Sequence, residues 1–163
     1  YLHDVRADSL LHESAKLAWT KYVLPEVRNP FLGDPNLFIN RPDFRDHIFL
    51  DAAEFSGCLK NGWGEGFKEQ HFSDELLRNR MLNEMFSEIV PPILHEDDLN
   101  AMYYSIENRS PFLDTDLFEF CYTIPTKYLM RDGFTKIILR DSMSDIVPNN
   151  ILKLIQDLHR NNP

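Results

Sequence analysis

The sequence lacks a segment that would cross a membrane. No apolar run approaches the ~20 residues needed to span a bilayer, and the amino end, residues 1–6, carries no basic and apolar signal segment. The chain is therefore expected to be a soluble protein of the cytoplasm, with no membrane partner.

The sequence is also poor in positive charge. It has 17 Lys and Arg against 26 Asp and Glu, a formal net charge of −9 at pH 7, and its basic residues form no stripe. Binding a nucleic acid needs such a stripe to neutralise the phosphates. A nucleic acid partner is therefore excluded, whereas a small group of cations can still bind one nucleotide.

Cysteines and strand patterns are scarce as well. The two cysteines, Cys58 and Cys121, lie far apart in apolar surroundings, which predicts buried free thiols rather than a disulfide. Runs that alternate apolar and polar residues between turn pairs are absent. The sequence therefore predicts almost no β-sheet.

What is present is the composition of an ordinary globular protein. The chain has 163 residues, of which 43% are apolar and 26% charged, and this predicts a single folded domain over residues 1–163. Residues 61–66 contain three glycines and mark a candidate subdomain break. The chain has no initiator methionine and opens on a polar segment, so we expect that it was cut from a longer protein.

Helical periodicity dominates the first third of the chain. An amphipathic helix is predicted over residues 8–24, ended by Pro25. Prolines and Asn-Pro and Asp-Pro steps predict a long loop over residues 28–42, and short helices are predicted over residues 44–59. The face of the first helix is formed by Leu11, Ala15, Ala18 and Tyr22.

Two more helices are predicted in the middle of the chain. Ser73 and Asp74 are expected to cap a helix that ends at the double proline of residues 91–92, and the next helix covers residues 93–105. The apolar face of the first of these consists of Leu77, Met81, Met85 and Ile89.

The remaining helices are expected over residues 115–122, over residues 134–146, and from Pro148 onward. We see no internal repeat and no heptad run. The predicted fold class is mainly α, an irregular assembly of several helices. The face of the last helix would contain Ile151, Leu154, Ile155 and Leu158.

Residues 95–114 read HEDDLNAMYYSIENRSPFLD. This stretch resembles the asparagine synthetase family, in which an acidic residue and a methionine precede the pattern S-[LI]-E-x-R-x-PFLD. The matching residues are Asp98, Met102, Ser105, Ile106, Glu107, Arg109, Pro111, Phe112, Leu113 and Asp114.

A second block of the same family follows at the expected separation. Residues 133–140, GFTKIILR, are similar to its G-x-x-K-x-x-L-R pattern, and residues 147–151 are similar to the [LV]-P-x-x-I that comes next. Two blocks in the family's order make a chance match improbable. The resemblance therefore covers the carboxyl-terminal part of the family's synthetase domain.

The resemblance implies a fold, a reaction and its cofactors. The fold would be the helical later part of an adenine nucleotide alpha hydrolase-like (PP-loop ATPase) domain. The reaction adenylates aspartate or a related small acid with ATP and forms an amide with ammonia released from glutamine. ATP and Mg²⁺ would serve the intact enzyme. Neither is expected to bind tightly to this fragment, which is expected to be inactive on its own.

The resemblance also assigns roles to single residues. Glu107 matches the glutamate that accepts a proton from the attacking amine. Lys136 and Arg140 match the positions that face ATP and pyrophosphate, and Arg109 and Asp114 would support the site. Such chemistry needs cations for the phosphates and a base near the acyl carbon. Lys136 is expected in the first turn of its helix, where the positive helix end would reinforce its charge.

Each of these residues also has a purely structural interpretation. Glu107 and Arg109 fit a solvated ion pair on a loop, in which Arg109 only holds the loop. Lys136 and Arg140 lie one helical turn apart and fit a solvated helix face. Asp114 fits a simple N-cap, because its short side chain can accept from free amide groups.

The sequence departs from the family pattern at several points. The Ser-Gly-Gly-x-Asp-Ser nucleotide loop and the glutaminase domain are absent, so the expected partners are the missing nucleotide-loop half of the domain and a glutaminase domain. Leu99 stands where an arginine is common. The basic stretch Arg-x-Lys-x-Gly-Phe after Ile151 is replaced by LKLIQDLHRNNP.

Two other functional classes remain open. The pairs His3-Asp4 and Asp46-His47 and the stretch of residues 95–98 suggest a His-Asp metal-dependent hydrolase, although we expect no metal site. The alternative is a non-catalytic helical interaction module. Metal analysis would distinguish the metal-dependent hydrolase from the amide-forming enzyme. A glycine-rich nucleotide loop upstream in the same reading frame would distinguish the amide-forming enzyme from the non-catalytic module.

Overall fold

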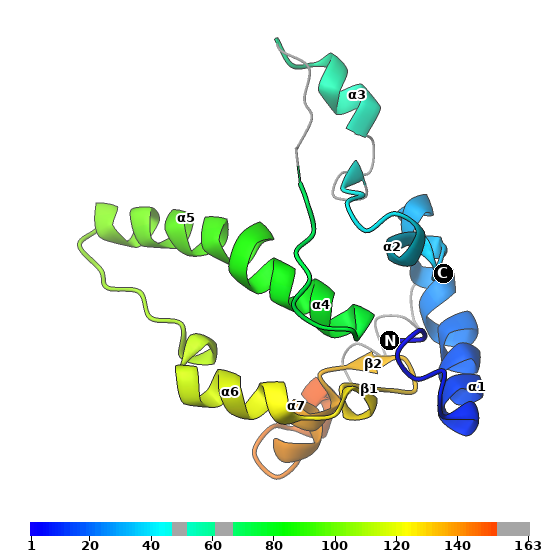
Figure 1. The fold of residues 1–163 in the computed structure, drawn as a ribbon. Helices are drawn as coiled ribbons and strands as arrows, with labels where there is room; N and C mark the ends of the chain where they lie inside the picture. The colour runs from blue at the N-terminus through cyan, green and yellow to red at the C-terminus, as the bar shows by residue number, and fades with distance from the viewer. Residues whose placement is uncertain (47–51, 61–66, 153–163) are drawn as a thin grey trace.

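The structure, a computed structural model, describes residues 1–46, 52–60 and 67–152. Helices dominate and two two-residue strands form the only sheet in these ranges, so the predicted fold class is confirmed (Figure 1). The helices are α1 (Ser9–Ala18), α2 (Leu37–Asn40), α3 (Ala52–Gly57), α4 (Leu76–Asn83), α5 (Val90–Tyr103), α6 (Thr115–Thr123), α7 (Ile137–Ser142) and α8 (Asn149–Leu152).

The first predicted helix is confirmed and its end is irregular. Asp8 is the N-cap of α1, and its Oδ1 accepts from the backbone N–H of Leu11 at 3.0 Å. After Ala18 the helix widens into the π-turn η1 (Trp19–Val23), and Pro25 then lies in a 3₁₀ turn, Leu24–Glu26. Proline therefore ends this helix as predicted, because it cannot donate the next backbone hydrogen bond.

The loop predicted over residues 28–42 contains short helical turns. Asn29 caps a 3₁₀ turn, Pro30–Gly33, by accepting from the backbone N–H of Phe31 at 3.0 Å. The four-residue helix α2 follows. Of the short helices predicted over residues 44–59, the structure shows α3, whereas residues 47–51, the break at residues 61–66 and the helix face beyond Leu152 lie outside the described residues.

The N-terminus of α4 is capped by a residue far away in the sequence. The two carboxylate oxygens of Asp4 accept from the backbone N–H groups of Leu76 and Leu77, each at 2.8 Å. The predicted caps, Ser73 and Asp74, are therefore wrong: α4 begins after Glu75, and Ser73 Oγ accepts from the N–H of Glu75 at 3.2 Å. Local sequence shows only neighbouring cap candidates, whereas here the carboxylate comes from 72 residues upstream.

We expect Asp4→Asn to lower the free energy of unfolding at pH 7 by about 1–2 kcal/mol, because the amide has one acceptor oxygen where the carboxylate uses two and it lacks the charge that a helix N-terminus favours. Burial opposes the ionisation of Asp4, but the N–H of Leu77, the ring of His3 and the N–H of Leu76 outweigh it and lower its pKa. A lowered folded-state pKa contributes stability above the unfolded pKa and loses it as the pH falls. The difference from wild type, measured by urea unfolding, should therefore shrink below about pH 4.

The matched control for this experiment is Asp74→Asn. The Asp74 side chain is fully exposed, with His71 as its ion-pair partner. We expect its free energy of unfolding to stay within about 0.5 kcal/mol of wild type. Equal losses in both variants would show that α4 has no special cap at Asp4.

The buried face of α4 is polar, so the predicted apolar face is wrong. Met81 and Ile89 of that face are 48% and 42% exposed. The side of the helix that is buried carries Asn79, Arg80, Leu82 and Asn83. Helical periodicity of apolar residues missed it because this face contacts an extended segment whose backbone needs hydrogen bonds rather than apolar cover.

That extended segment, residues 69–73, is held by two asparagines of α4. Asn79 Oδ1 accepts from the N–H groups of Phe72 and Ser73 at 2.7 and 3.2 Å. Asn83 Oδ1 accepts from the N–H of Gln70, and its Nδ2 donates to the carbonyl of Gln70, both at 2.8 Å. Asn79 and Asn83, one helical turn apart, thus supply the backbone hydrogen bonds that a neighbouring strand would otherwise make.

The double proline starts a helix. The π-turn η5 (Glu84–Glu88) follows α4 directly, and α5 begins at Val90 with Pro91 and Pro92 in its first turn. A proline is tolerated there because the first N–H groups of a helix have no partner within the helix. The predicted break between two helices is therefore confirmed, although α5 starts three residues earlier than predicted and ends at Tyr103.

The helix predicted over residues 134–146 is shorter and follows a hairpin. Strands β1 (Met130–Arg131) and β2 (Phe134–Thr135) pair antiparallel around Asp132 and Gly133, which both have positive φ. Gly133, at φ +82°, approaches η1 so closely that a Cβ would lie 3.1 Å from Cβ of Tyr22. The hairpin therefore needs glycine there, and it delays the helix to Ile137.

The cysteines differ from their prediction in one respect. Cys58 and Cys121 are free thiols as predicted, but both are exposed, so their predicted burial is wrong. Cys121 lies on α6, which has no buried residue. None of the helices described here is long and apolar enough to cross a bilayer.

Candidate functional site

The glutamate of the sequence motif lies on the loop between α5 and α6. Residues 106–110 have no regular structure, which confirms the prediction that Glu107 is non-helical. Helix α5 ends in a Schellman motif, in which Ser105 has φ +57° and the N–H of Ile106 donates to the carbonyl of Ala101 at 3.0 Å. This reversal sends the chain away from the axis of α5 immediately before Glu107.

The far end of the loop is fixed by a cap. Pro111–Leu113 form a 3₁₀ turn, and Oδ1 of Asp114 then accepts from the N–H of Leu117 at 3.0 Å. Asp114 is the N-cap of α6, as its structural interpretation predicted. Glu107 therefore lies between two structured ends, a Schellman motif and a capped helix.

Glu107 and Arg109 form an ion pair at the surface. Oε1 of Glu107 accepts from Nε of Arg109 at 2.9 Å and lies 2.9 Å from its Nη2. The side chains are 72% and 82% exposed, and such exposed pairs contribute only about 0–1 kcal/mol to stability. The pair orients the carboxylate, and its Oε2 accepts no hydrogen bond from the described residues.

The two cationic residues lie around the start of α7. Lys136 is the N-cap, with φ +57°, so its predicted place in the first turn of the helix is wrong. The preceding hairpin shifts the start of the helix past it. Its side chain is exposed, and its ammonium has no hydrogen-bond or ion-pair partner within the described ranges.

Arg140 is held by backbone carbonyls. Its Nε donates to the carbonyl of Thr135 at 3.1 Å and its Nη1 to that of Leu152 at 2.5 Å. The guanidinium also lies 5.7 Å from the ring centre of Phe134. Arg140 thus ties α7 to the hairpin and to α8, and its Nη2 donates to no described group.

The structure does not bring the predicted acid-base and phosphate groups into direct contact. In Figure 1 the loop between α5 and α6 lies at the far end of these two helices, whereas α7 lies near the opposite end of α6. Among the residues that are described, no hydrogen bond or ion pair joins Glu107 to Lys136 or Arg140. The candidate site therefore consists of two separate parts.

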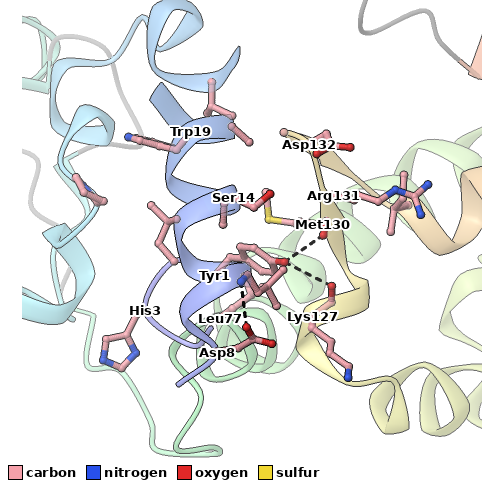
Figure 2. A pocket seen from close by; sticks show the side chains of 18 of the residues that line it. Tyr1, His3, Asp8, Ser14, Trp19, Leu77, Lys127, Met130, Arg131 and Asp132 are labelled. Atoms are coloured by element: carbon pink, nitrogen blue, oxygen red, sulfur yellow. Dashed lines mark hydrogen bonds between the residues drawn. The ribbon is translucent and has the colours of Figure 1, made fainter. Parts of the chain in front are cut away.

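An open pocket that sequence reasoning missed lies between α1, the start of α4 and the hairpin (Figure 2). Its volume is about 620 Å³, and its lining is mainly apolar. The hydroxyl of Tyr1 shares its one proton across it between the carbonyls of Lys127 and Met130, at 3.4 and 3.2 Å. None of the predicted site residues lines this pocket. No motif signals it, because it forms between segments over 70 residues apart in the chain.

The candidate metal ligands in the described residues either have another structural role or do not lie close to one another. His3 Nδ1 is 3.1 Å from Oδ1 of Asp4, and this buried carboxylate caps α4. Residues 95–98 are exposed along α5. Within the described ranges no three His, Cys, Asp or Glu side chains gather so that they could hold a metal ion.

The described part of the chain is mainly helical, with the Glu107 loop in one place and the cationic residues Lys136 and Arg140 in another. Residues 7–154 match the asparagine synthase family, and the chain belongs to that family. It is 38% identical over 60 residues to asparagine synthetase [glutamine-hydrolyzing] 1 of Bacillus subtilis (strain 168). The match covers 37% of the chain and 10% of the relative, so the chain spans a small part of that protein. No solved structure matches.

Proposed function

We propose that this chain is the helical later part of a cytoplasmic, ATP-dependent amidotransferase that adenylates aspartate or a related acid and forms an amide with ammonia from glutamine. Membership of the asparagine synthase family supports the class of reaction. The observation that carries the proposal for this chain is the Glu107 loop, which is structured at both ends and presents a carboxylate oriented by Arg109.

In the proposed reaction Glu107 is the general base. An attacking ammonia must lose a proton as the amide bond forms, and a carboxylate within hydrogen-bond reach can accept it. The Nε and Nη2 groups of Arg109 hold Oε1, which leaves Oε2 to face the amine. Arg109 thereby supports the site by fixing the carboxylate, and Asp114 supports it by fixing the start of α6.

The two cationic residues at α7, Lys136 and Arg140, fit the phosphates of ATP. Lys136 has an exposed ammonium without a partner among the described groups, and Arg140 keeps one nitrogen of its guanidinium without a described acceptor. Bound ATP, with Mg²⁺, would supply the activation of the acid. Lys136 and Arg140 would attract the phosphates and stabilise the leaving pyrophosphate through their charge.

The surfaces of α5 and α6 support the proposed partners, a nucleotide-loop half of the domain and a glutaminase domain. Neither helix has a buried residue, although both carry large apolar side chains. Large apolar side chains grouped on an exposed surface are typical of an interface. On α5 they include Leu99 and Met102, each 58% exposed, and on α6 Phe120 at 64%, whereas Ile106 at 61% and Phe112 at 72% lie in the loop between the two helices.

The proposal is tested by assaying the full-length protein with ATP, glutamine or ammonia, and a panel of small acids. We expect one acid to give exchange between pyrophosphate and ATP, and the amide to form only when a nitrogen source is added. Amide formation without ATP, or no acid-dependent exchange with any member of the panel, would contradict the proposed function. Exchange between pyrophosphate and ATP without any amide product would support adenylation of the acid and would contradict the proposed amide-forming step.

A further inference from the structure

The helix that leads to the Glu107 loop is held at its base. No residue of α5 is buried, and its densest contacts within the chain are with η5. Figure 1 shows α4 and α5 running on from one another as a single arm, with the Glu107 loop at its far end. Within the described residues, the direction of α5 is therefore decided at the π-turn that joins it to α4.

Charged side chains surround this π-turn. We call Arg45, Glu69, Arg80, Glu84 and Glu88 the ion cluster. Arg80 is its centre: Nη1 lies 3.1 Å from Oε2 of Glu69, and Nη2 lies 2.9 Å from Oε2 of Glu88 and 3.5 Å from Oε1 of Glu84. Its side chain is only 9% exposed.

A second arginine closes the ion cluster. Arg45 contacts Glu88 through Nε and lies 3.8 Å from Glu69 through Nη2. The side chains of Arg45, Glu69 and Glu88 are 3%, 6% and 4% exposed. The two arginines and the two buried glutamates thus alternate, and each charge faces opposite charges.

Two of the three carboxylates belong to η5 itself, since Glu84 and Glu88 are its first and last residues. Arg80 lies one turn earlier, on α4, and forms ion pairs with both Glu84 and Glu88. A π-turn is a rare form of helix that is often found at functional sites. A guanidinium that holds both of its ends limits the angles at which α5 can leave.

We propose that Arg80 is a positioning residue: by holding Glu84 and Glu88 it sets the direction of α5 and thereby the place of the Glu107 loop. The structural part of this inference stands on its own, and only the role of Glu107 rests on the proposed function. Breaking one side of a buried ion pair leaves the other charges uncompensated, so the effect of losing Arg80 should be large.

The test measures the distance between α1 and α5 in the full-length protein by double electron–electron resonance. Spin labels are placed at Lys16→Cys and Asn100→Cys, two exposed positions, after the other accessible cysteines are replaced. We expect one narrow distance distribution for wild type, and a broadened or displaced one for Arg80→Met. The variant Arg80→Lys should lie between them, because an ammonium cannot bind two carboxylates in the geometry of the guanidinium fork.

Two further variants keep the test decisive. Arg131→Met is the control, because Arg131 pairs with Asp141 at an exposed site, and its distribution should match wild type. Glu84→Gln covers the case in which Arg80→Met fails to fold: Glu84 is 42% exposed and Arg80 keeps Glu69 and Glu88, so no buried charge is left unpaired and a smaller broadening is expected. A folded Arg80→Met with the wild-type distribution would overturn the proposal, as would equal broadening in Arg131→Met.

Kinetics in the full-length protein distinguish the structural role of Arg80 from the proposed catalytic role of Glu107. If Glu107 is the base, Arg80→Met should lower kcat by up to about 10²-fold with little change in KM for the acid, because a displacement of about 1 Å has that effect on a reacting group. An altered distance distribution with unchanged kcat would leave Arg80 as the residue that orients α5 and would contradict the proposed role of Glu107.

Discussion

Glu107→Gln is expected to lower the rate of amide formation in the full-length protein by roughly 10²-fold or more, the scale of general acid-base catalysis. The amide side chain keeps the shape and removes the base. Glu107 is 72% exposed and its pair with Arg109 is a surface pair, so the thermal midpoint should stay nearly unchanged. The rate falls because the attacking ammonia then has no group to take its proton.

The measurement pairs a melting curve with an assay of amide product and of acid-dependent pyrophosphate release. Glu119→Gln, an exposed glutamate on α6, is the matched control and should behave like wild type in both. Pyrophosphate release should persist in Glu107→Gln, since the base acts after adenylation. Normal amide turnover would remove Glu107 from the mechanism, and a lower midpoint with proportionate loss of activity would leave it a structural residue.

Helix positions were predictable wherever a local signal decides them. Pro25 ends the first helix, and Asp114 caps α6, because each acts on its own neighbours in the chain. The cap of α4 was not predictable, since Asp4 reaches it across 72 residues. The buried polar face of α4 was missed for the same reason: the partner of Asn79 and Asn83 is a segment that only the folded chain brings there.

The candidate site was predictable residue by residue but not as an arrangement. The motif identified the Glu107 loop, and its proline and cap explain why that loop is not helical. The hairpin that displaces Lys136 from its helix has only two residues in each strand, too few for an alternating pattern to show. The contact of Arg80 with Glu84 has the i,i+4 spacing of an ordinary helical ion pair, but its contact with Glu88, eight residues further on, has no such signal.

Asn83→Ala is expected to lower the free energy of unfolding by about 1.5–4.5 kcal/mol, which sums the loss of three hydrogen bonds at about 0.5–1.5 kcal/mol each. Asn83 is fully buried, and its side chain makes three hydrogen bonds of 2.8 Å, to the N–H and the carbonyl of Gln70 and to the carbonyl of Asn79. The alanine methyl reaches none of them. The backbone of Gln70 would lose these partners, since no strand lies beside this extended segment in the described residues.

Asn100→Ala is the matched control for this experiment, because Asn100 is an exposed asparagine within α5. Its free energy of unfolding should stay within about 0.5 kcal/mol of wild type or rise slightly, since alanine is the better helix former. Urea unfolding followed by circular dichroism measures both variants, and hydrogen exchange at Gln70 reports on the local contact. If Asn83→Ala matched Asn100→Ala in stability and the N–H of Gln70 stayed protected, the asparagines of α4 would not be what holds the extended segment in place.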